Sequence, residues 1–126
     1  MNLNQVTLPS TDVPRAVTFY RNLGFTLIVD SPPQYARFEC PEGDATFSLH
    51  FGDAAIADPG VIVYFECRDL NRTYAELSAR GIVFESAPTD RPWLWREAYL
   101  RDPDGNLLCL FQAGQNRRHP PWRVPD

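Results

Sequence analysis

The sequence predicts an α+β fold in which a βαβββ module occurs twice within 126 residues. Two helical segments run from an N-capping aspartate to a terminating glycine over the same distance, Asp12 to Gly24 and Asp69 to Gly81. The same offset of 57 residues (12 to 69) aligns the apolar stretches that precede the two helices. A Pro-acid-Gly turn also precedes the last predicted strand of each half. Chance rarely aligns caps, stops and turns together, so internal duplication is favoured over two unrelated helices of equal length.

Each helical segment has its own N-terminal signal, apolar face and terminating glycine. In TDVPRAVTFYRNLGF, Pro14 occupies the first turn, where its missing N–H costs nothing. Apolar residues recur at helical spacing in both segments, as Ala16, Tyr20 and Leu23 in the first and Leu70, Tyr74 and Leu77 in the second. The glycines then supply the left-handed conformation that ends a helix.

Short apolar or β-branched stretches supply the strands. One precedes each helix, and three follow it, at 25–30, 35–40 and 45–51 in the first half and at 82–86, 97–101 and 106–111 in the second. The turns at 41–44 and 103–106 predict a hairpin between the third and fourth strands of each module. We therefore expect a single domain with module one at 1–57, module two at 58–112 and a tail at 113–126.

Composition excludes several classes of function. A net charge of −4 and a pI near 5.1 give no electrostatic footprint for nucleic acid, and they favour a cationic small molecule as ligand. No window approaches the roughly 20 apolar residues of a membrane span. The N-terminus has no basic region followed by a long apolar run, so we expect a cytoplasmic protein without a signal peptide. Three widely spaced cysteines without a CxxC pattern indicate reduced thiols.

The paired modules, the opening NQVTLPSTDVPRAVTFYRNLGF and the turn DPDGN resemble the vicinal oxygen chelate superfamily. That superfamily includes glyoxalases, extradiol dioxygenases, fosfomycin-resistance thiol transferases and bleomycin-binding resistance proteins. The resemblance covers residues 3–112 and implies a glyoxalase-like cup, a partly open barrel formed by the two modules. It also implies a homodimer with a small-molecule ligand in the cup.

The same resemblance implies four inward positions that hold a divalent metal in the catalytic members. They fall here at Gln5, Ser48, Ile62 and Cys109. Glutamine is a ligand in some glyoxalases, but Ile62 stands where a histidine is usual and Cys109 where a glutamate is usual. A hydrocarbon side chain cannot hold a metal that acts as a Lewis acid, so the usual site is absent.

Strand alternation predicts further inward residues. His50 lies two residues beyond Ser48, Tyr64 and Glu66 share the face of Ile62, and Phe111 shares that of Cys109. The resemblance to fosfomycin-resistance proteins adds Glu97, Tyr99 and a tail arginine near Arg118. Trp93 and Trp95 are expected at the rim, where they would stack a flat or cationic ligand. The predicted ligand-binding set is Gln5, Ser48, His50, Tyr64, Glu66, Trp93, Trp95, Glu97, Tyr99 and Arg118.

Alternatives remain open for several of these residues. Gln5, His50, Glu66 and Glu97 would suit a displaced manganese, iron or zinc site, and a His–Glu pair would suit a general base. A half-buried strand histidine bonded to a carboxylate is the favoured interpretation of His50. The tryptophans are also suited to a dimer interface.

The tail and the last-strand cysteine also have two interpretations each. The arginines of GQNRRHPPWRVPD would anchor an anionic group, but a strap with Trp122 docked in a groove is favoured. Cys109 is either a nucleophile or a small buried core residue, and the core role is favoured because no activating base is evident.

Two main functions follow. The first is a small-molecule-binding protein of the glyoxalase/bleomycin-resistance type that binds an amphipathic or cationic ligand without the usual metal site. The second is an enzyme, a metal-dependent lyase, thiol transferase or dioxygenase with a displaced site around His50. Whether the chain is an enzyme, and whether it uses a divalent metal or no cofactor, stays open, as does a third possibility, an interaction domain with an empty cup.

Overall fold

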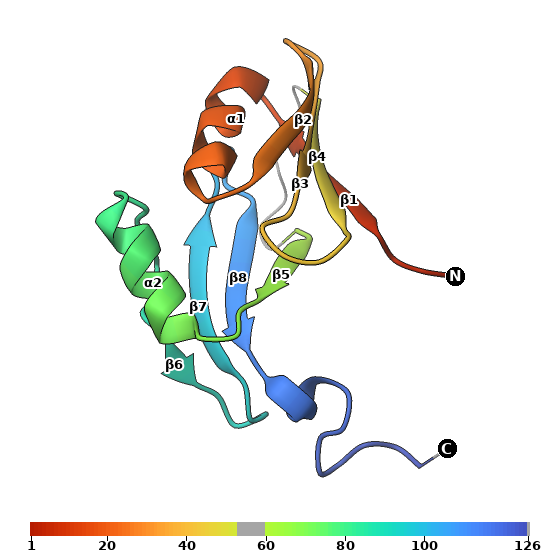
Figure 1. Ribbon diagram of the computed structural model, residues 1–126, viewed down its shortest axis with the longest axis vertical. Helices are drawn as coiled ribbons and strands as arrows, with labels where there is room; N and C mark the ends of the chain where they lie inside the picture. The colour runs from red at the N-terminus through yellow and green to blue at the C-terminus, as the bar shows by residue number, and fades with distance from the viewer. Residues whose placement is uncertain (53–59, 126) are drawn as a thin grey trace. The chain divides into compact units, whose positions relative to one another are not determined.

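The computed structural model describes residues 1–52 and 60–125, which divide into two compact units (Figure 1). The first unit is Met1–Gly60 with Asp102–Asn106, and the second is Val61–Arg101 with Leu107–Asp126. Each unit has the predicted order β-α-β-β-β. The predicted module boundary at residue 57 lies outside the described residues.

The first unit consists of β1 (Gln5–Ser10), α1 (Val13–Asn22), β2 (Thr26–Ser31), β3 (Tyr35–Glu39) and β4 (Thr46–Phe51). Its sheet has the order β1-β4-β3-β2, with β1 parallel to β4 and the other pairs antiparallel. The side chain of Asp12 caps α1 by accepting a hydrogen bond from the backbone N–H of Arg15. Tyr20 packs its ring against Phe38 and Phe47 of the sheet, so α1 covers the face to which these alternate residues belong.

The second unit repeats this arrangement with β5 (Ile62–Glu66), α2 (Leu70–Ala79), β6 (Thr89–Asp90), β7 (Arg96–Arg101) and β8 (Leu107–Gln112), followed by a short 3-10 helix, η1 (Gly114–Arg117). The sheet order is β5-β8-β7-β6, with β5 parallel to β8. Asp69 caps α2 as predicted. The face that α2 covers is marked by two contacts, from Arg96 Nε to Asn71 Oδ1 and from the backbone N–H of Leu70 to Gln112 Oε1.

The prediction of a strand at 82–86 is wrong. The only strand between α2 and β7 in the described residues is β6, which has two residues, Thr89–Asp90. The ring of Phe84 instead packs on Tyr74 of α2, with 4.7 Å between the centroids. The backbone N–H groups of Glu85 and Ser86 both point to the carbonyl of Tyr99, so the segment follows β7 without a regular ladder.

The strands of the two sheets have the same register. Three rows of residues run from β1 through β4 to β3, namely Gln5–Thr46–Glu39, Thr7–Ser48–Arg37 and Pro9–His50–Tyr35. The equivalent rows from β5 through β8 to β7 are Ile62–Leu107–Arg101, Tyr64–Cys109–Tyr99 and Glu66–Phe111–Glu97. Cross-strand partners point to the same side of a sheet, so each set of rows forms the face opposite the helix of its unit. We call these two surfaces the open faces.

The turn at 102–106 belongs to the first unit, although the strands that it joins belong to the second. Asp102 is 4 % exposed and accepts a hydrogen bond of 2.7 Å from the hydroxyl of Tyr20 in α1. Asp104 accepts a bond of 2.6 Å from Ser10 Oγ at the end of β1. The DPDGN motif is therefore a structural element that is fixed by buried polar contacts.

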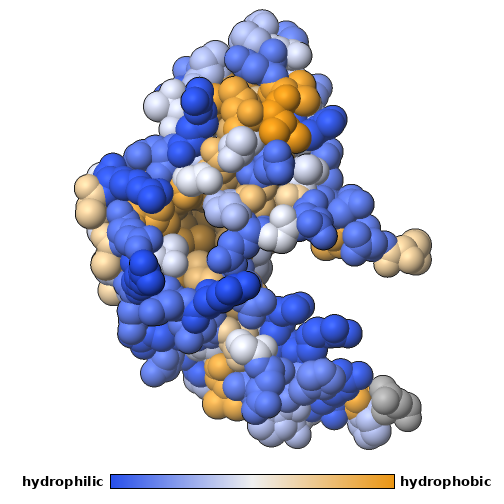
Figure 2. Space-filling view, in the orientation of Figure 1, coloured by the Kyte–Doolittle hydropathy of each residue, from blue (hydrophilic) through white to orange (hydrophobic). Residues whose placement is uncertain are grey.

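The strands form two separate sheets that do not close into a single barrel within the described ranges. Neither α1 nor α2 has the length and apolar character of a membrane-crossing helix, and no other helix of the described chain does. A hydrophobic patch lies over β2 of the first unit on the face shown in Figure 2.

Candidate ligand-binding site

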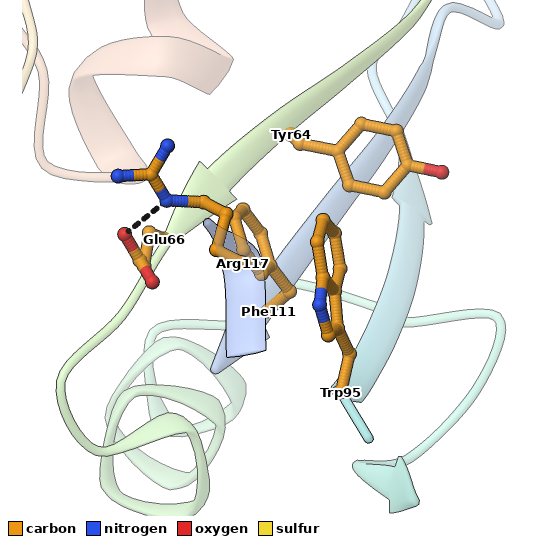
Figure 3. Close-up of a pocket in the computed structure, with 5 residues that line it drawn as sticks. All are labelled: Tyr64, Glu66, Trp95, Phe111 and Arg117. Carbon is orange, nitrogen blue, oxygen red and sulfur yellow. Dashed lines mark ion pairs between the residues drawn. The ribbon is translucent and has the colours of Figure 1, made fainter. Parts of the chain in front are cut away.

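A hollow of about 410 Å³ lies on the open face of the second sheet (Figure 3). Its walls are Tyr64 from β5, Trp95 from the residue before β7 and Phe111 from β8, together with Glu66 and Arg117. Strand alternation places these side chains on one face, because the rows of the register bring Glu66 beside Phe111. The hollow is thus built by the second unit alone.

Three aromatic rings form one side of the hollow. Trp95 stacks on Phe111 with 4.5 Å between the centroids and an interplanar angle of 16°. Tyr64 meets both rings edge-on, at 6.0 Å from Trp95 and 5.8 Å from Phe111. Tyr64 is 43 % exposed while Phe111 is 4 % exposed, so the cluster has a buried base and an accessible rim. Such a platform suits a flat or cationic group.

An ion pair forms the other side. Arg117 of η1 reaches Glu66 of β5, with 3.3 Å between Nε and Oε1 (Figure 3). Both side chains are partly exposed, at 49 % and 40 %, so the pair contributes little to stability. The Glu66 carboxylate therefore remains accessible to a competing cation from solvent.

Behind the hollow, a buried carboxylate fixes the segment that carries the tryptophans. Glu97 is 1 % exposed and accepts hydrogen bonds from Trp93 Nε1 at 2.8 Å and from the Tyr99 hydroxyl at 3.1 Å. Arg91 Nε lies 3.5 Å from the same carboxylate. The segment between β6 and β7 also contains Leu94 at φ 67°, a strained conformation for a residue with a side chain. Glu97 therefore positions the rim and is not itself accessible to a ligand.

The middle row of the same face, Tyr64–Cys109–Tyr99, carries no charged group. Cys109 is fully buried, and burial, followed by the charge of Glu97, raises the pKa of its thiol to about 12. Burial, together with Tyr64, Cys109 and Glu97, raises the pKa of the Tyr99 hydroxyl well above its ordinary value. Both groups stay protonated near neutral pH. Cys109 thus has the environment of a core residue and not that of a nucleophile.

The first unit holds three of the predicted site residues on its own open face. Ser48 Oγ is buried and bonded to Thr7 Oγ1 at 2.6 Å, and Gln5 Oε1 accepts from Thr46 Oγ1 at 2.7 Å. His50 is exposed near the end of β4, and it has no hydrogen bond to a carboxylate within the described ranges. The half-buried, carboxylate-bonded histidine of the sequence interpretation is therefore not what the structure has.

The residues at the four usual metal positions do not fit a divalent ion. Ile62 offers no donor atom, and Cys109 keeps its proton until a pH near its pKa of about 12. The oxygens of Ser48 and Gln5 already take part in side-chain hydrogen bonds.

The alternative set of metal ligands is also not assembled by the described part of the chain, which contains no group of three or more His, Cys, Asp and Glu side chains arranged for a metal. Glu66 and Glu97 flank Phe111 on opposite neighbouring strands, about 10 Å apart at twice the strand spacing. Glu66 is paired with Arg117, whereas Glu97 accepts two hydrogen bonds and forms an ion pair with Arg91.

The tail departs from its predicted arrangement. Arg117, not Arg118, reaches the hollow, because η1 turns the chain back toward β5, while Arg118 is exposed and its carbonyl accepts a bond from Arg123. Trp122 is 57 % exposed, so the prediction that it docks in a groove is wrong. No sequence signal separated Arg117 from Arg118, because neither the length nor the phase of a 3-10 turn is encoded by periodicity.

Of the ten predicted ligand-binding residues, the structure brings three together at the hollow, namely Tyr64, Glu66 and Trp95. Trp93, Glu97 and Tyr99 form the layer behind it, and Gln5, Ser48 and His50 lie in the first unit. Arg37 of the first open face and Arg91, which lies beside Glu97 of the second, were not identified from the sequence. Alternation in YARFE would have placed Arg37, since Ala36 and Phe38 are the apolar residues of that strand.

Comparison with known proteins gives a consistent family. The model of the Glyoxalase/Bleomycin resistance protein/Dioxygenase superfamily matches residues 2–110. Among curated proteins, the chain is 29 % identical to the uncharacterized protein YraH of Bacillus subtilis (strain 168), over 89 % of this chain and 98 % of that protein.

Solved structures agree in fold. A glyoxalase/bleomycin resistance protein/dioxygenase from Nocardioides superposes with a TM-score of 0.78 at 25 % identity, covering 99 % of this chain and 90 % of that one. A bleomycin-binding protein complexed with bleomycin gives 0.72 at 25 % identity, covering 89 % and 98 %. Lactoylglutathione lyase from Agrobacterium tumefaciens gives 0.74 at 22 % identity, covering 94 % and 96 %, and that likeness concerns the fold alone.

Proposed function

Because the chain belongs to the glyoxalase/bleomycin resistance protein/dioxygenase superfamily, we propose that it is a small-molecule-binding protein whose ligand occupies the hollow of the second unit. The ligand carries a flat aromatic group and a positive charge. The proposal rests on one observation, the cluster of Tyr64, Trp95 and Phe111 that lines an open hollow beside the Glu66 carboxylate.

The aromatic rings supply most of the binding free energy. An aromatic group that covers the exposed edge of Tyr64 and the ring of Trp95 removes apolar surface from water at both partners. The buried layer around Glu97 holds the segment before β7 in place, so little conformational entropy is lost when the ligand binds.

Charge selects the ligand. Glu66 attracts a cation, and its present partner Arg117 is tethered by a short, partly exposed 3-10 helix. A cationic ligand replaces Arg117 at the carboxylate, whereas an anionic aromatic meets the negative charge of Glu66 next to the rings. Removal of Arg117 is therefore expected to strengthen binding of a cation.

The binding needs no metal. The donor set at the usual positions supports this part of the proposal, because Ile62 has a hydrocarbon side chain and the thiol of Cys109 is protonated and buried. The 25 % identical bleomycin-binding protein supports a binding role for this fold without assigning bleomycin to this chain.

Isothermal titration calorimetry with bleomycin and, separately, with the cationic planar dye ethidium tests the proposal. The anionic aromatic 1-anilinonaphthalene-8-sulfonate serves as the comparison ligand. We expect saturable binding of at least one cationic probe in metal-free buffer containing a chelator. Trp95→Ala should weaken it about tenfold or more, and Arg117→Ala should tighten it.

Trp122→Ala is the matched control, because this tryptophan is exposed on the tail and does not line the hollow. Its affinity should equal that of the unsubstituted protein. Circular dichroism confirms that each variant is folded. Equal affinities of the Trp95 and Trp122 variants, or no binding of either cationic probe, would rule the proposed function out.

A further inference from the structure

We propose that the open face of the first sheet binds an oxyanion, the carboxylate or phosphate group of a small molecule, through Arg37. This site lies within the first unit and shares no residue with the aromatic hollow. The outcome of its test is therefore independent of the outcome for the proposed function.

The pairing of the half-buried arginines points to this site. The described residues contain four arginines of intermediate exposure, and three of them have a carboxylate within 3.5 Å, in the pairs Arg91–Glu97, Arg96–Asp90 and Arg101–Glu85. Arg37 is the fourth, and no carboxylate of the described ranges pairs with it. A partly buried charge without a counterion is unfavourable, so a half-buried arginine of this kind is a natural anion receptor.

The guanidinium of Arg37 is held in place by a neutral group. Its Nε donates a hydrogen bond of 2.9 Å to the hydroxyl of Tyr35, two residues earlier on β3. The guanidinium carbon lies 5.5 Å from the centroid of the Tyr35 ring. This contact uses one donor and fixes the plane of the group, and no residue of the described chain bonds its two terminal nitrogens. A fixed fork of two N–H donors is the geometry that binds carboxylate and phosphate.

Residues with hydroxyl groups share the row of Arg37. Ser48 is the cross-strand partner of Arg37 and is fully buried, and its Oγ is bonded to Thr7 of the same row. His50 is the cross-strand partner of Tyr35. Burial raises the pKa of Tyr35, but its polar neighbours Ser48, Arg37 and Gln5 and the charge of Arg37 outweigh burial and lower the pKa overall.

One carboxylate shares the face. Glu39 lies two residues beyond Arg37 on β3, about 7 Å along the strand, and it is exposed. No ion pair joins the two side chains. Glu39 weakens an anion site at Arg37 through long-range repulsion, so Glu39→Gln is expected to raise the affinity for an anion about twofold.

Nitrogen-15 NMR of the arginine Nε–Hε groups tests the proposal directly on the unsubstituted protein. Inorganic phosphate and, in a separate series, acetate are titrated at constant ionic strength with chloride. We expect a saturable shift of the Arg37 signal, which is assigned by its loss in Arg37→Gln. Arg21, an exposed arginine in the last turn of α1, is the internal control and should not shift.

The variants make the result quantitative. Arg37→Gln should weaken phosphate binding about tenfold or more, while Arg37→Lys, which keeps the charge and loses the fork, should retain part of it. Tighter binding of phosphate than acetate identifies a phosphorylated ligand, and the reverse order identifies a carboxylic acid. A linear, unsaturable shift at Arg37, or an equal shift at Arg21, overturns the proposal whether or not the variants fold.

Discussion

The two halves of the chain have the same scaffold, but their open faces differ in chemical character. Strand order, strand directions and register agree between the sheets, yet the central row is Thr7–Ser48–Arg37 in the first and Tyr64–Cys109–Tyr99 in the second. The backbone ladder and the helix-covered core fix the sheet, and neither depends on side chains of the opposite face. A duplicated scaffold can therefore carry a polar face and an aromatic face at equivalent positions.

The two hairpin turns differ in the same way. All four residues of the turn at 41–44 are exposed, whereas Asp102 and Asn106 of the turn at 102–106 are buried. Asp102 bonds Tyr20, which belongs to the FYRNLGF segment. The two motifs that mark the superfamily are thus partners in one structural network. Motifs that serve the fold identify the family and leave the function of its members open.

The largest expected effect separates the two turns. Asp102→Ala leaves the buried Tyr20 hydroxyl and the backbone N–H of Asn106 without their acceptor, so it should lower the free energy of unfolding by about 3 to 5 kcal/mol. Glu42→Ala, in the exposed turn, should change it by less than about 0.5 kcal/mol. Urea denaturation followed by circular dichroism measures both. Similar losses for the two variants would contradict the distinction between the turns.

The second largest expected effect is the loss of unfolding free energy when Glu97, on the open face of the second sheet, loses its charge. Glu97 occupies the position in its row that Tyr35 has in the first sheet, and it is the buried partner of Arg91. Glu97→Gln removes the charge and should cost about 2 kcal/mol of unfolding free energy. Glu85→Gln is the matched control, because Glu85 pairs with Arg101 in solvent and should cost at most about 0.5 kcal/mol. Urea denaturation measures the free energy of unfolding of both variants. Equal losses would mean that burial of the ion pair does not matter.

The smallest effect is a separation of tyrosine titrations. The pKa of Tyr35 is lowered by the polar and cationic groups around it, which exceed the opposing effect of burial, whereas burial and the acidic face raise that of Tyr99. In a spectrophotometric titration near 295 nm, Tyr35→Phe should remove the earliest transition, and Arg37→Gln should move it to higher pH. An unchanged curve for Tyr35→Phe would contradict the difference between the faces.

The raised pKa values of Tyr20, Tyr99 and Cys109 also predict how stability falls at alkaline pH. Burial raises the pKa of Tyr20 and Tyr99 above the ordinary value of 10.0, and burial raises that of Cys109 from 9.0 to about 12. The unfolded chain therefore loses these protons first as the pH rises. The contribution of these three groups to stability should be full below pH 9 and should decline above it, first through the thiol and then through the tyrosines. Thermal unfolding at a series of pH values checks this sign.

Sequence reasoning succeeded where the signal is local. Asp12, Asp69 and the two glycines marked the helices, and alternation placed Tyr64, Glu66 and Phe111 on one face, as the register of the strands confirms. It failed at 82–86, where β-branched and aromatic residues predicted a strand. The ring of Phe84 instead packs on α2, and the backbone bonds there are irregular. Tertiary packing outweighed local propensity in that segment.

The sequence by itself determined the duplicated βαβββ fold and the family. These follow from caps, periodicity and the identity of single residues, which are properties of short stretches of chain. Tertiary structure alone decided that Arg117 meets Glu66, that Glu97 is buried with two hydrogen-bond donors and an ion pair, and that Arg37 has no carboxylate partner in the described chain. A charge acquires its role from neighbours that lie far away in the chain, and only the folded backbone brings them within a few ångströms.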